Sequence, residues 1–222
     1  MKITVIQNSA YGRAGLVEKF IDAKGWTCRR TMSPKEIITT DLANIIDDAV
    51  VFLGSRRGVY ETHVQWIARE RALMKLLVAN SVPVFGICFG AQLLATALGG
   101  TVMPMGRRYR GWMENATALT PVWRGPWLRW HGDFITLPDD VKILAADNNT
   151  VQAFEQGSAV GVQFHPEVSA AVLQEWGGYR SAMPLADSNA LDEALRFANQ
   201  HVSVIEKRSF ELFDAVFNRI TS

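Results

Sequence analysis

The chain is poor in the features that mark several large classes of protein. Its 222 residues include only two cysteines, Cys28 and Cys88, and no apolar run approaches the roughly 20 residues needed to cross a bilayer. Basic residues number 23 and acidic residues 22, so the net charge is only +1. Such a balance favours neither nucleic acid nor an anionic membrane as a partner.

Metal and nucleotide sites are not indicated either. The chain has four histidines, His63, His131, His165 and His201. None of them is spaced from a cysteine or an acidic residue in the way that metal ligands usually are. No glycine-rich phosphate loop is evident, so we expect no metal and no cofactor. The apolar strand at the N-terminus is too short for a signal peptide. Together with two cysteines far apart in sequence, this favours a cytoplasmic protein with free thiols.

Strand-like and helix-like segments alternate along most of the chain. Continuous apolar runs at residues 49–53 and 82–87 are typical of strands buried on both faces of a parallel sheet. Further strands are expected at residues 2–7, 26–31, 141–146, 151–155 and 159–164, and helices at about residues 16–24, 64–80 and 92–98. This alternation predicts an α/β fold, a doubly wound and mostly parallel sheet with flanking helices.

Two regions depart from that alternation. Residues 101–137 are rich in Trp, Arg, Gly and Pro, which predicts short antiparallel strands and loops. From about residue 170 to residue 222, apolar residues recur at helical spacing, which predicts a helical C-terminal tail. No repeat, low-complexity segment or interdomain linker is evident, so we expect a single domain over residues 1–222.

The strongest chemical signal is a cysteine between a buried strand and a helix. The sequence Gly86-Ile-Cys-Phe-Gly90 is typical of a nucleophile elbow with Cys in place of Ser. Its glycines allow close approach of neighbouring backbone, and the helix N-terminus would favour a thiolate on Cys88. The N–H of Phe89 would point at the oxygen of an attacked carbonyl. A buried structural cysteine in a tight connection is the alternative.

A second segment offers the base that a cysteine nucleophile needs. His165-Pro-Glu167 follows an apolar strand, so both polar side chains can project from the strand end toward one place. Histidine suits proton transfer near neutral pH, and a carboxylate can fix its tautomer. A histidine before a proline is by itself more often a surface loop residue. The two segments together make a much stronger case than either alone.

These motifs resemble the signature pair of class I glutamine amidotransferases. The resemblance rests on Gly86-Ile-Cys-Phe-Gly-Ala-Gln-Leu-Leu-Ala95 and Gly161-Val-Gln-Phe-His-Pro-Glu167, with support from Trp130-His-Gly-Asp133, residues 54–61 and residues 97–102. The resemblance runs from about residue 50 to residue 168. Over this stretch the chain is similar above all to the glutaminase domain of GMP synthetase. This resemblance implies the flavodoxin-like fold of that family.

By motif, the resemblance implies a role for each matched residue. Cys88 would be the nucleophile, His165 the acid and base, and Glu167 its orienter. The N–H of Phe89 and a second N–H from the Gly54–Ser55 loop would form the oxyanion hole. Gln92 would line the pocket for the γ-glutamyl group. His131 also matches, although a structural role for it is at least as expected.

Two departures from the family pattern suggest a changed pocket. A loop commonly written Gly-Gly-Pro reads Gly54-Ser55-Arg56 here, and Ser55 can donate its N–H if its φ is not positive. Arg56 is either a solvated loop residue or the partner of a substrate carboxylate. Where relatives often carry Glu-Ile-Gly-Trp, this chain has Tyr109-Arg-Gly-Trp112, which would place Tyr109 at the entrance to the site.

Three functions remain open on the sequence. The favoured one is a self-sufficient, Cys-dependent hydrolase of γ-glutamyl amides or peptides, in which a γ-glutamyl thioester forms on the enzyme and the leaving amine is larger than ammonia. The second is a free-standing glutaminase subunit that delivers ammonia to a separate synthase partner. The third, a binding module without catalysis, is disfavoured because Cys88, His165 and Glu167 are all present.

Overall fold

A computed structural model of the chain describes residues 1–32, 35–39, 41–148 and 150–221. The strands are β1 (Lys2–Gln7), β2 (Thr27–Met32), β3 (Ala49–Phe52), β4 (Val84–Ile87), β5 (Thr101–Met113), β6 (Thr117–Ala118), β7 (Trp127–Thr136), β8 (Lys142–Ala146), β9 (Val151–Gln156) and β10 (Ala159–Val162). The α-helices are α1 (Leu16–Ala23), α2 (Lys35–Thr39), α3 (Gln65–Ala79), α4 (Phe89–Ala97), α5 (Ala170–Trp176), α6 (Leu185–Gln200) and α7 (Val202–Ile220). Short 3-10 turns lie at Leu42–Ile45, Pro121–Trp123 and Gly177–Ala182.

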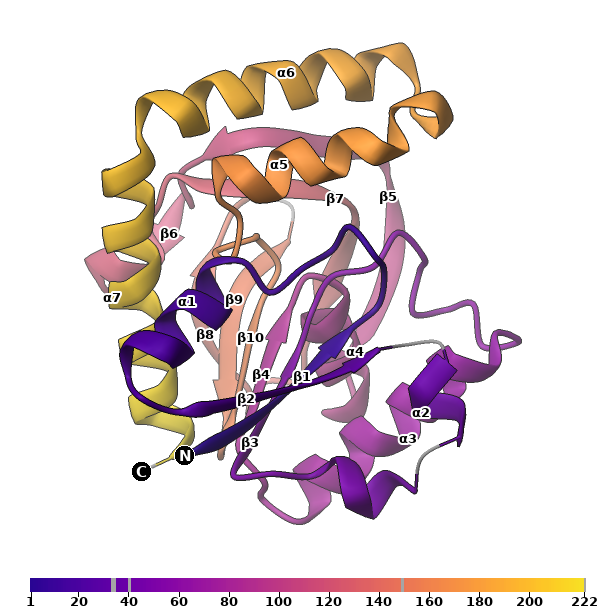
Figure 1. The fold of residues 1–222 in the computed structure, drawn as a ribbon. Coiled ribbons are helices and arrows are strands. Elements are labelled where there is room, and N and C mark those ends of the chain that lie inside the picture. Colours follow the sequence, from indigo (N-terminus) through magenta and orange to yellow (C-terminus); the bar gives the residue numbers. More distant parts are fainter. Residues whose placement is uncertain (33–34, 40, 149, 222) are drawn as a thin grey trace.

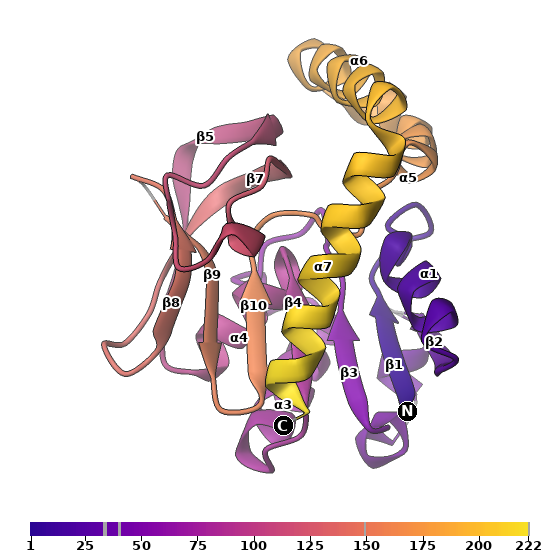
Figure 2. The same cartoon turned by 90° about the vertical axis from the view of Figure 1, so that its left-hand side faces the viewer.

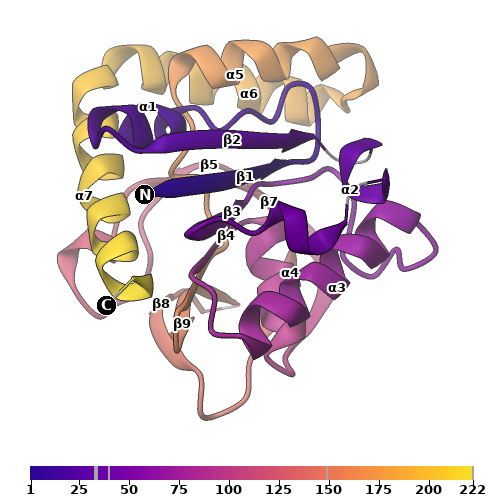
Figure 3. The same ribbon diagram turned by 60° about the horizontal axis from the view of Figure 1, so that its bottom comes forward.

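The main sheet has eight strands in the order β2-β1-β3-β4-β10-β9-β8-β6. The first five run parallel to one another, and β9, β8 and β6 continue the sheet in antiparallel pairs. Helices cover both faces, with α1 and α7 on one and α3 and α4 on the other (Figures 1–3). The four residues of β3, β4 and β10 are all buried, as continuous apolar runs predict for such central strands.

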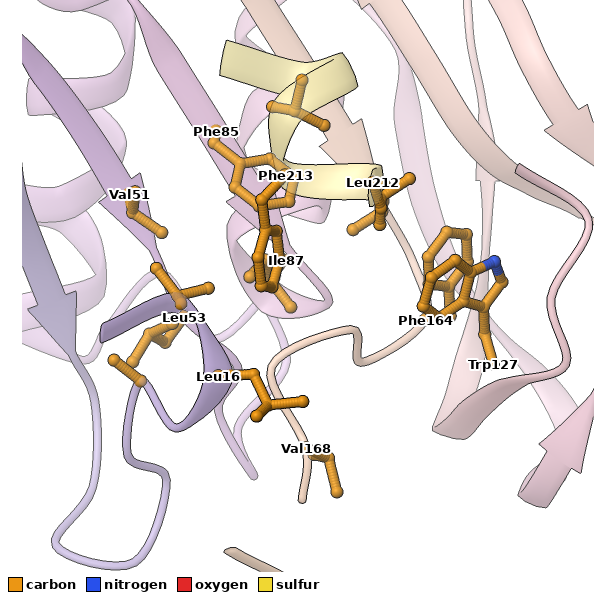
Figure 4. Close-up of a cluster of buried hydrophobic side chains, with 14 of the residues drawn as sticks. Leu16, Val51, Leu53, Phe85, Ile87, Trp127, Phe164, Val168, Leu212 and Phe213 are labelled. Atoms are coloured by element: carbon orange, nitrogen blue, oxygen red, sulfur yellow. The ribbon is translucent and has the colours of Figure 1, made fainter. Parts of the chain in front are cut away.

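The larger core lies between the sheet and α7. Phe213 of α7 packs edge-on against Phe85 of β4, with ring centroids 6.2 Å apart, and both side chains are fully buried (Figure 4). Close by, Trp127 of β7 stacks on Phe164, with centroids 4.9 Å apart and planes 7° from parallel. This stack connects the core to the segment that carries His165.

The region at residues 101–137 differs from the prediction in one respect. Two of its strands are antiparallel, as predicted, but long: β5 has 13 residues and β7 has 10, and they pair as a separate two-stranded ribbon. The two-residue strand β6 joins the edge of the main sheet. The ribbon stands beyond the carboxyl ends of the parallel strands, opposite α5 and α6 (Figure 2). The length of the strands was underestimated because half-exposed ribbons lack a clear apolar alternation.

The C-terminal region contains α5, α6 and α7, where helices are expected from the apolar spacing. Helix α4 begins at Phe89, three residues before the predicted start, because Cys88 itself is its N-cap. The short helix α2 was not anticipated from the sequence. The assignment of residues 1–222 to one domain stays a prediction.

Gly90 has no room for a side chain. A Cβ there would lie 2.3 Å from the carbonyl oxygen of Phe52 and 2.6 Å from its Cβ, so strand β3 would have to move. We expect Gly90→Ala to lower the free energy of unfolding by about 2–3 kcal/mol. Gly157→Ala is the control: it has open space but a φ of +54°, so we expect a loss of about 1 kcal/mol. Chemical denaturation measures both, and equal losses would contradict the close packing of α4 on β3.

In the part of the chain that the structure describes, no helix is long and apolar enough to span a membrane. Nor do those residues contain a group of three or more His, Cys, Asp or Glu side chains placed to hold a metal ion.

Candidate active site

Cys88 occupies a strained turn between β4 and α4. Its φ of +52° is one of two positive values at non-glycine residues in the described segments, the other being at Ser81. The turn is held from both sides, because the Cys88 N–H donates to the carbonyl of Val162 at 2.8 Å and its carbonyl accepts from the N–H of Gln92 at 2.9 Å. Such strain, kept by surrounding structure, is typical of a nucleophile at a strand-to-helix turn.

His165 and Glu167 lie beside this turn, just past the end of β10. The Nδ1 atom of His165 and Oε1 of Glu167 are 2.7 Å apart, and both side chains are at least 95% buried. The backbone is fixed by a hydrogen bond from the His165 N–H to the carbonyl of Leu128 in β7, at 2.8 Å. The Glu167 carbonyl accepts from the N–H of Leu16 at 2.9 Å. Glu167 therefore orients the imidazole ring through one of its nitrogens.

The imidazole of His165 interacts on its other side with Cys88. Burial lowers the pKa of His165, but the Glu167 carboxylate and Cys88 raise it more, so the pKa lies well above the usual 6.5. The imidazolium is thus favoured at neutral pH. His165 lies between Glu167 and Cys88, and the proton on its ring could be donated to a leaving amine.

The loop after β3 lies against both groups. A Cβ added to Gly54 would be 3.0 Å from Cε1 of His165 and 3.7 Å from Cβ of Cys88. Ser55 is not among the described residues with positive φ, so the condition for its N–H to serve as a donor is met. The ring of Phe89 turns away and packs on Trp66, with centroids 5.6 Å apart, so Phe89 can contribute only its backbone N–H.

A cavity of about 520 Å³ opens over Cys88, His165 and Glu167. It is bordered by the loop after β3, the β5–β7 ribbon and the segment that joins α5 to α6. Among the predicted site residues, those that line it are Cys88, His165, Glu167, Gly54, Ser55, Gln92, Arg56 and His131. Tyr109 is not among the lining residues. Its ring instead packs on His131, with centroids 5.2 Å apart, and it supports the site from behind.

Gln92 belongs to a chain of polar contacts on one wall. Its Nε2 donates to Oδ2 of Asp133 at 3.4 Å, and the hydroxyl of Tyr60 donates to Oδ1 of the same carboxylate at 3.4 Å. Burial raises the pKa of Asp133, although these hydrogen bonds act against it. Tyr60 was missed from the sequence. Its position inside the matched stretch 54–61 was the only signal for it.

His131 is buried and uncharged at neutral pH. Burial lowers its pKa to about 4, against the effect of the carbonyl of Asp133, 3.0 Å from Nδ1. The neutral ring donates through Nδ1 to this carbonyl, which leaves Nε2 as an acceptor. Both predicted roles for His131, in structure and in lining the pocket, fit this position.

Arginine and aromatic side chains surround the cavity on the other walls. Arg57 pairs with Glu61 at 2.6 Å, and Arg56 lies over the ring of Tyr179, 4.4 Å from its centroid. Trp123 and Trp127 are core residues, whereas Trp130 lines the cavity. It meets Trp176 edge-on at 5.8 Å. Trp176 in turn meets the His165 ring at 5.3 Å, a contact that sequence spacing did not reveal.

A known protein family matches the segment that carries this site. The family model described as glutamine amidotransferase class-I matches residues 28–175, which include the cysteine, the histidine and the carboxylate. The chain belongs to the class-I glutamine amidotransferase family. This confirms the resemblance drawn from the two motifs.

Related sequences and structures agree with that membership. The chain is 33% identical over 152 residues to a GMP synthase (glutamine-hydrolyzing) of Thermomicrobium roseum, a match covering 65% of this chain and 25% of that protein. A GMP synthase of Mycobacterium marinum is 39% identical over 134 residues, covering 54% and 23%. The matches thus span about a quarter of the length of these GMP synthases.

Solved structures cover nearly the whole chain. A glutamine amidotransferase from Thermotoga maritima superposes with a TM-score of 0.84 and 25% identity, covering 98% of each chain. One from Methylobacillus flagellatus gives a TM-score of 0.82 at 20% identity, covering 98% of this chain and 94% of that one. These likenesses confirm the predicted fold class, a mostly parallel sheet with flanking helices.

Proposed function

We propose that this amidotransferase-family protein is a cysteine-dependent hydrolase of γ-glutamyl amide bonds, acting through a γ-glutamyl thioester. The observation that carries the proposal is the contiguous set of Cys88, His165 and Glu167 at the floor of the cavity. In the proposed first step, the sulfur of Cys88 attacks the γ-carbonyl carbon. The N–H groups of Phe89 and of the Gly54–Ser55 loop then stabilise the oxyanion.

His165 moves the protons in both halves of the reaction. Its imidazolium donates a proton to the leaving amine as the carbon–nitrogen bond breaks, which leaves the γ-glutamyl group bound to Cys88. The neutral imidazole then takes a proton from water, the hydroxide attacks the thioester, and glutamate departs as the thiolate reforms. Glu167 keeps the ring in place through Nδ1.

The rest of the cavity supports a γ-glutamyl group at this position. The carboxylate of Asp133 beside Gln92 suits the α-ammonium of the γ-glutamyl group, and Arg56 suits its α-carboxylate. A volume of about 520 Å³ lies within the range of sites for drug-sized ligands, so space remains for a leaving group larger than ammonia. Trp176 and Trp130 border that space next to His165.

A glutaminase subunit serving a separate synthase is the second candidate function. It is favoured by the names of the related sequences, which are GMP synthases that hydrolyse glutamine. In such a subunit the cavity would take glutamine and release ammonia to its partner.

Release of glutamate by the purified protein, without any partner, tests the choice. We expect kcat/KM for a γ-glutamyl alkylamine or γ-glutamyl peptide to exceed that for glutamine by about tenfold or more, because only the larger leaving group contacts the aromatic wall. The Cys88→Ala protein serves as the blank for each substrate. Glutamine hydrolysis that arises only when a synthase is added would instead establish the subunit function.

A further inference from the structure

An unusual feature of the β5–β7 ribbon lies directly over the cavity. Pro104 pairs with Asp133 and Tyr109 pairs with His131, so residues 105–108 of β5 face the single residue Gly132 of β7. We call residues 105–108 the β5 bulge. Gly106 within it has a φ of +70°, and three of its four residues, Gly106, Arg107 and Arg108, line the cavity. Bulges next to active sites commonly re-aim side chains, and this one directs two cations at the site.

The two arginines of the β5 bulge differ in their partners. Arg108 donates to Asp187 of α6 at 3.3 Å, and Arg110 pairs with the same carboxylate, so this acid is already shared by two cations. Arg107 donates to the hydroxyl of Tyr109 at 3.1 Å and lies over its ring, and no ion pair joins it to a described carboxylate. Arg107 is also exposed, so its guanidinium is available to an anion.

The position of the β5 bulge relative to His165 indicates which part of a substrate would reach it. The leaving amine must lie beside His165, which protonates it, and Trp176 and Trp130 continue the wall from that ring. Trp130 pairs with Arg110 in the ribbon, two residues from the end of the bulge. Asp133, which with Gln92 marks the place of the γ-glutamyl group, pairs with Pro104 at the other end of the bulge. The bulge therefore lies between the place of the γ-glutamyl group and the aromatic wall, and it borders the path of a leaving group that extends along that wall.

We propose that the β5 bulge selects γ-glutamyl compounds whose leaving amine carries a carboxylate, as in γ-glutamyl dipeptides, and that Arg107 binds this carboxylate. The planar guanidinium fork suits bidentate binding of a carboxylate better than any other cationic side chain. Arg108 and Arg110 share one buried acid, Asp187, and no ion pair joins Arg107 to a described carboxylate, so the bulge side of the cavity retains positive charge. The proposal rests on the proposed γ-glutamyl hydrolase function and specifies its substrate class.

Binding to the inactive Cys88→Ala protein tests the proposal without turnover. The probes are γ-glutamyl-alanine and γ-glutamyl-alaninamide, which differ only in the terminal carboxylate, and calorimetry gives both dissociation constants. We expect the carboxylate ligand to bind at least about tenfold more tightly, as one charge-assisted contact provides. Adding Arg107→Gln should bring the two constants to within about threefold, while Arg107→Lys should keep part of the preference.

The control variant is Arg124→Gln, which removes the same charge from an exposed position that does not line the cavity. It should leave the tenfold preference intact. Equal binding of the two ligands to the parent protein, or a preference that survives Arg107→Gln, would overturn the proposal. Glutamate release by the protein with Cys88 present is measured separately on the same two compounds. If neither is hydrolysed, the proposed hydrolase function fails, whereas the binding ratio still decides the role of Arg107.

Discussion

Replacing Cys88 with alanine is expected to lower kcat/KM for every γ-glutamyl substrate by about 10⁴-fold or more. The thiol is the atom that bonds to the substrate in the proposed mechanism, and removal of a nucleophile costs losses on this scale in comparable enzymes. The fold should persist because Ala is smaller than Cys and meets the same φ of +52° that the cysteine already adopts.

The matched control for this substitution is Cys28→Ala. Cys28 lies on β2 and does not line the cavity, so its loss should change kcat/KM by less than about twofold. Circular dichroism and the unfolding midpoint verify that both variants are folded. A folded Cys88→Ala protein that still releases glutamate at the parent rate would show that another group starts the reaction.

Glu167→Gln should give the second large effect, with a distinct dependence on pH. The amide keeps the shape but removes the charge that raises the pKa of His165, and it can present an N–H that favours the wrong tautomer. We expect kcat/KM to fall by about 10²–10⁴-fold. The alkaline limb of its pH profile, where the imidazolium is lost, should move to lower pH than in the parent.

The same pKa shift predicts how stability depends on pH. Because the folded-state pKa of His165 is raised above 6.5, its contribution to stability is complete below that pH and is lost as the pH rises through the folded pKa. Glu167→Gln should flatten this loss. Denaturant unfolding between pH 6 and the alkaline range measures it, and identical slopes in parent and variant would contradict the coupling of Glu167 to His165.

The residues predictable from sequence are those in short, contiguous motifs. The elbow at Cys88 and the pair His165–Glu167 were visible because a strand end fixes the direction of the next few side chains. The central strands were equally clear, since strands buried on both faces are apolar throughout. The order of the strands in the sheet could not be derived from spacing, because it depends on which strands pair in the folded chain.

Residues brought in by tertiary packing could not be found in this way. Trp176 reaches His165 from α5, and Asp187 reaches the β5 bulge from α6, over separations that no local pattern encodes. Tyr109 was expected at the entrance, yet the bulge before it changes the register of β5, so that its ring lies behind His131 instead. An inserted bulge of this kind has no distinct signature beyond Gly106.

Mass spectrometry of acid-quenched enzyme during turnover of a γ-glutamyl substrate can detect a covalent γ-glutamyl thioester on Cys88. We expect a γ-glutamyl adduct on the peptide that carries Cys88, sensitive to hydroxylamine and missing from the Cys88→Ala protein. Steady release of glutamate with an adduct on another residue, or undiminished release by the Cys88→Ala protein, would contradict it.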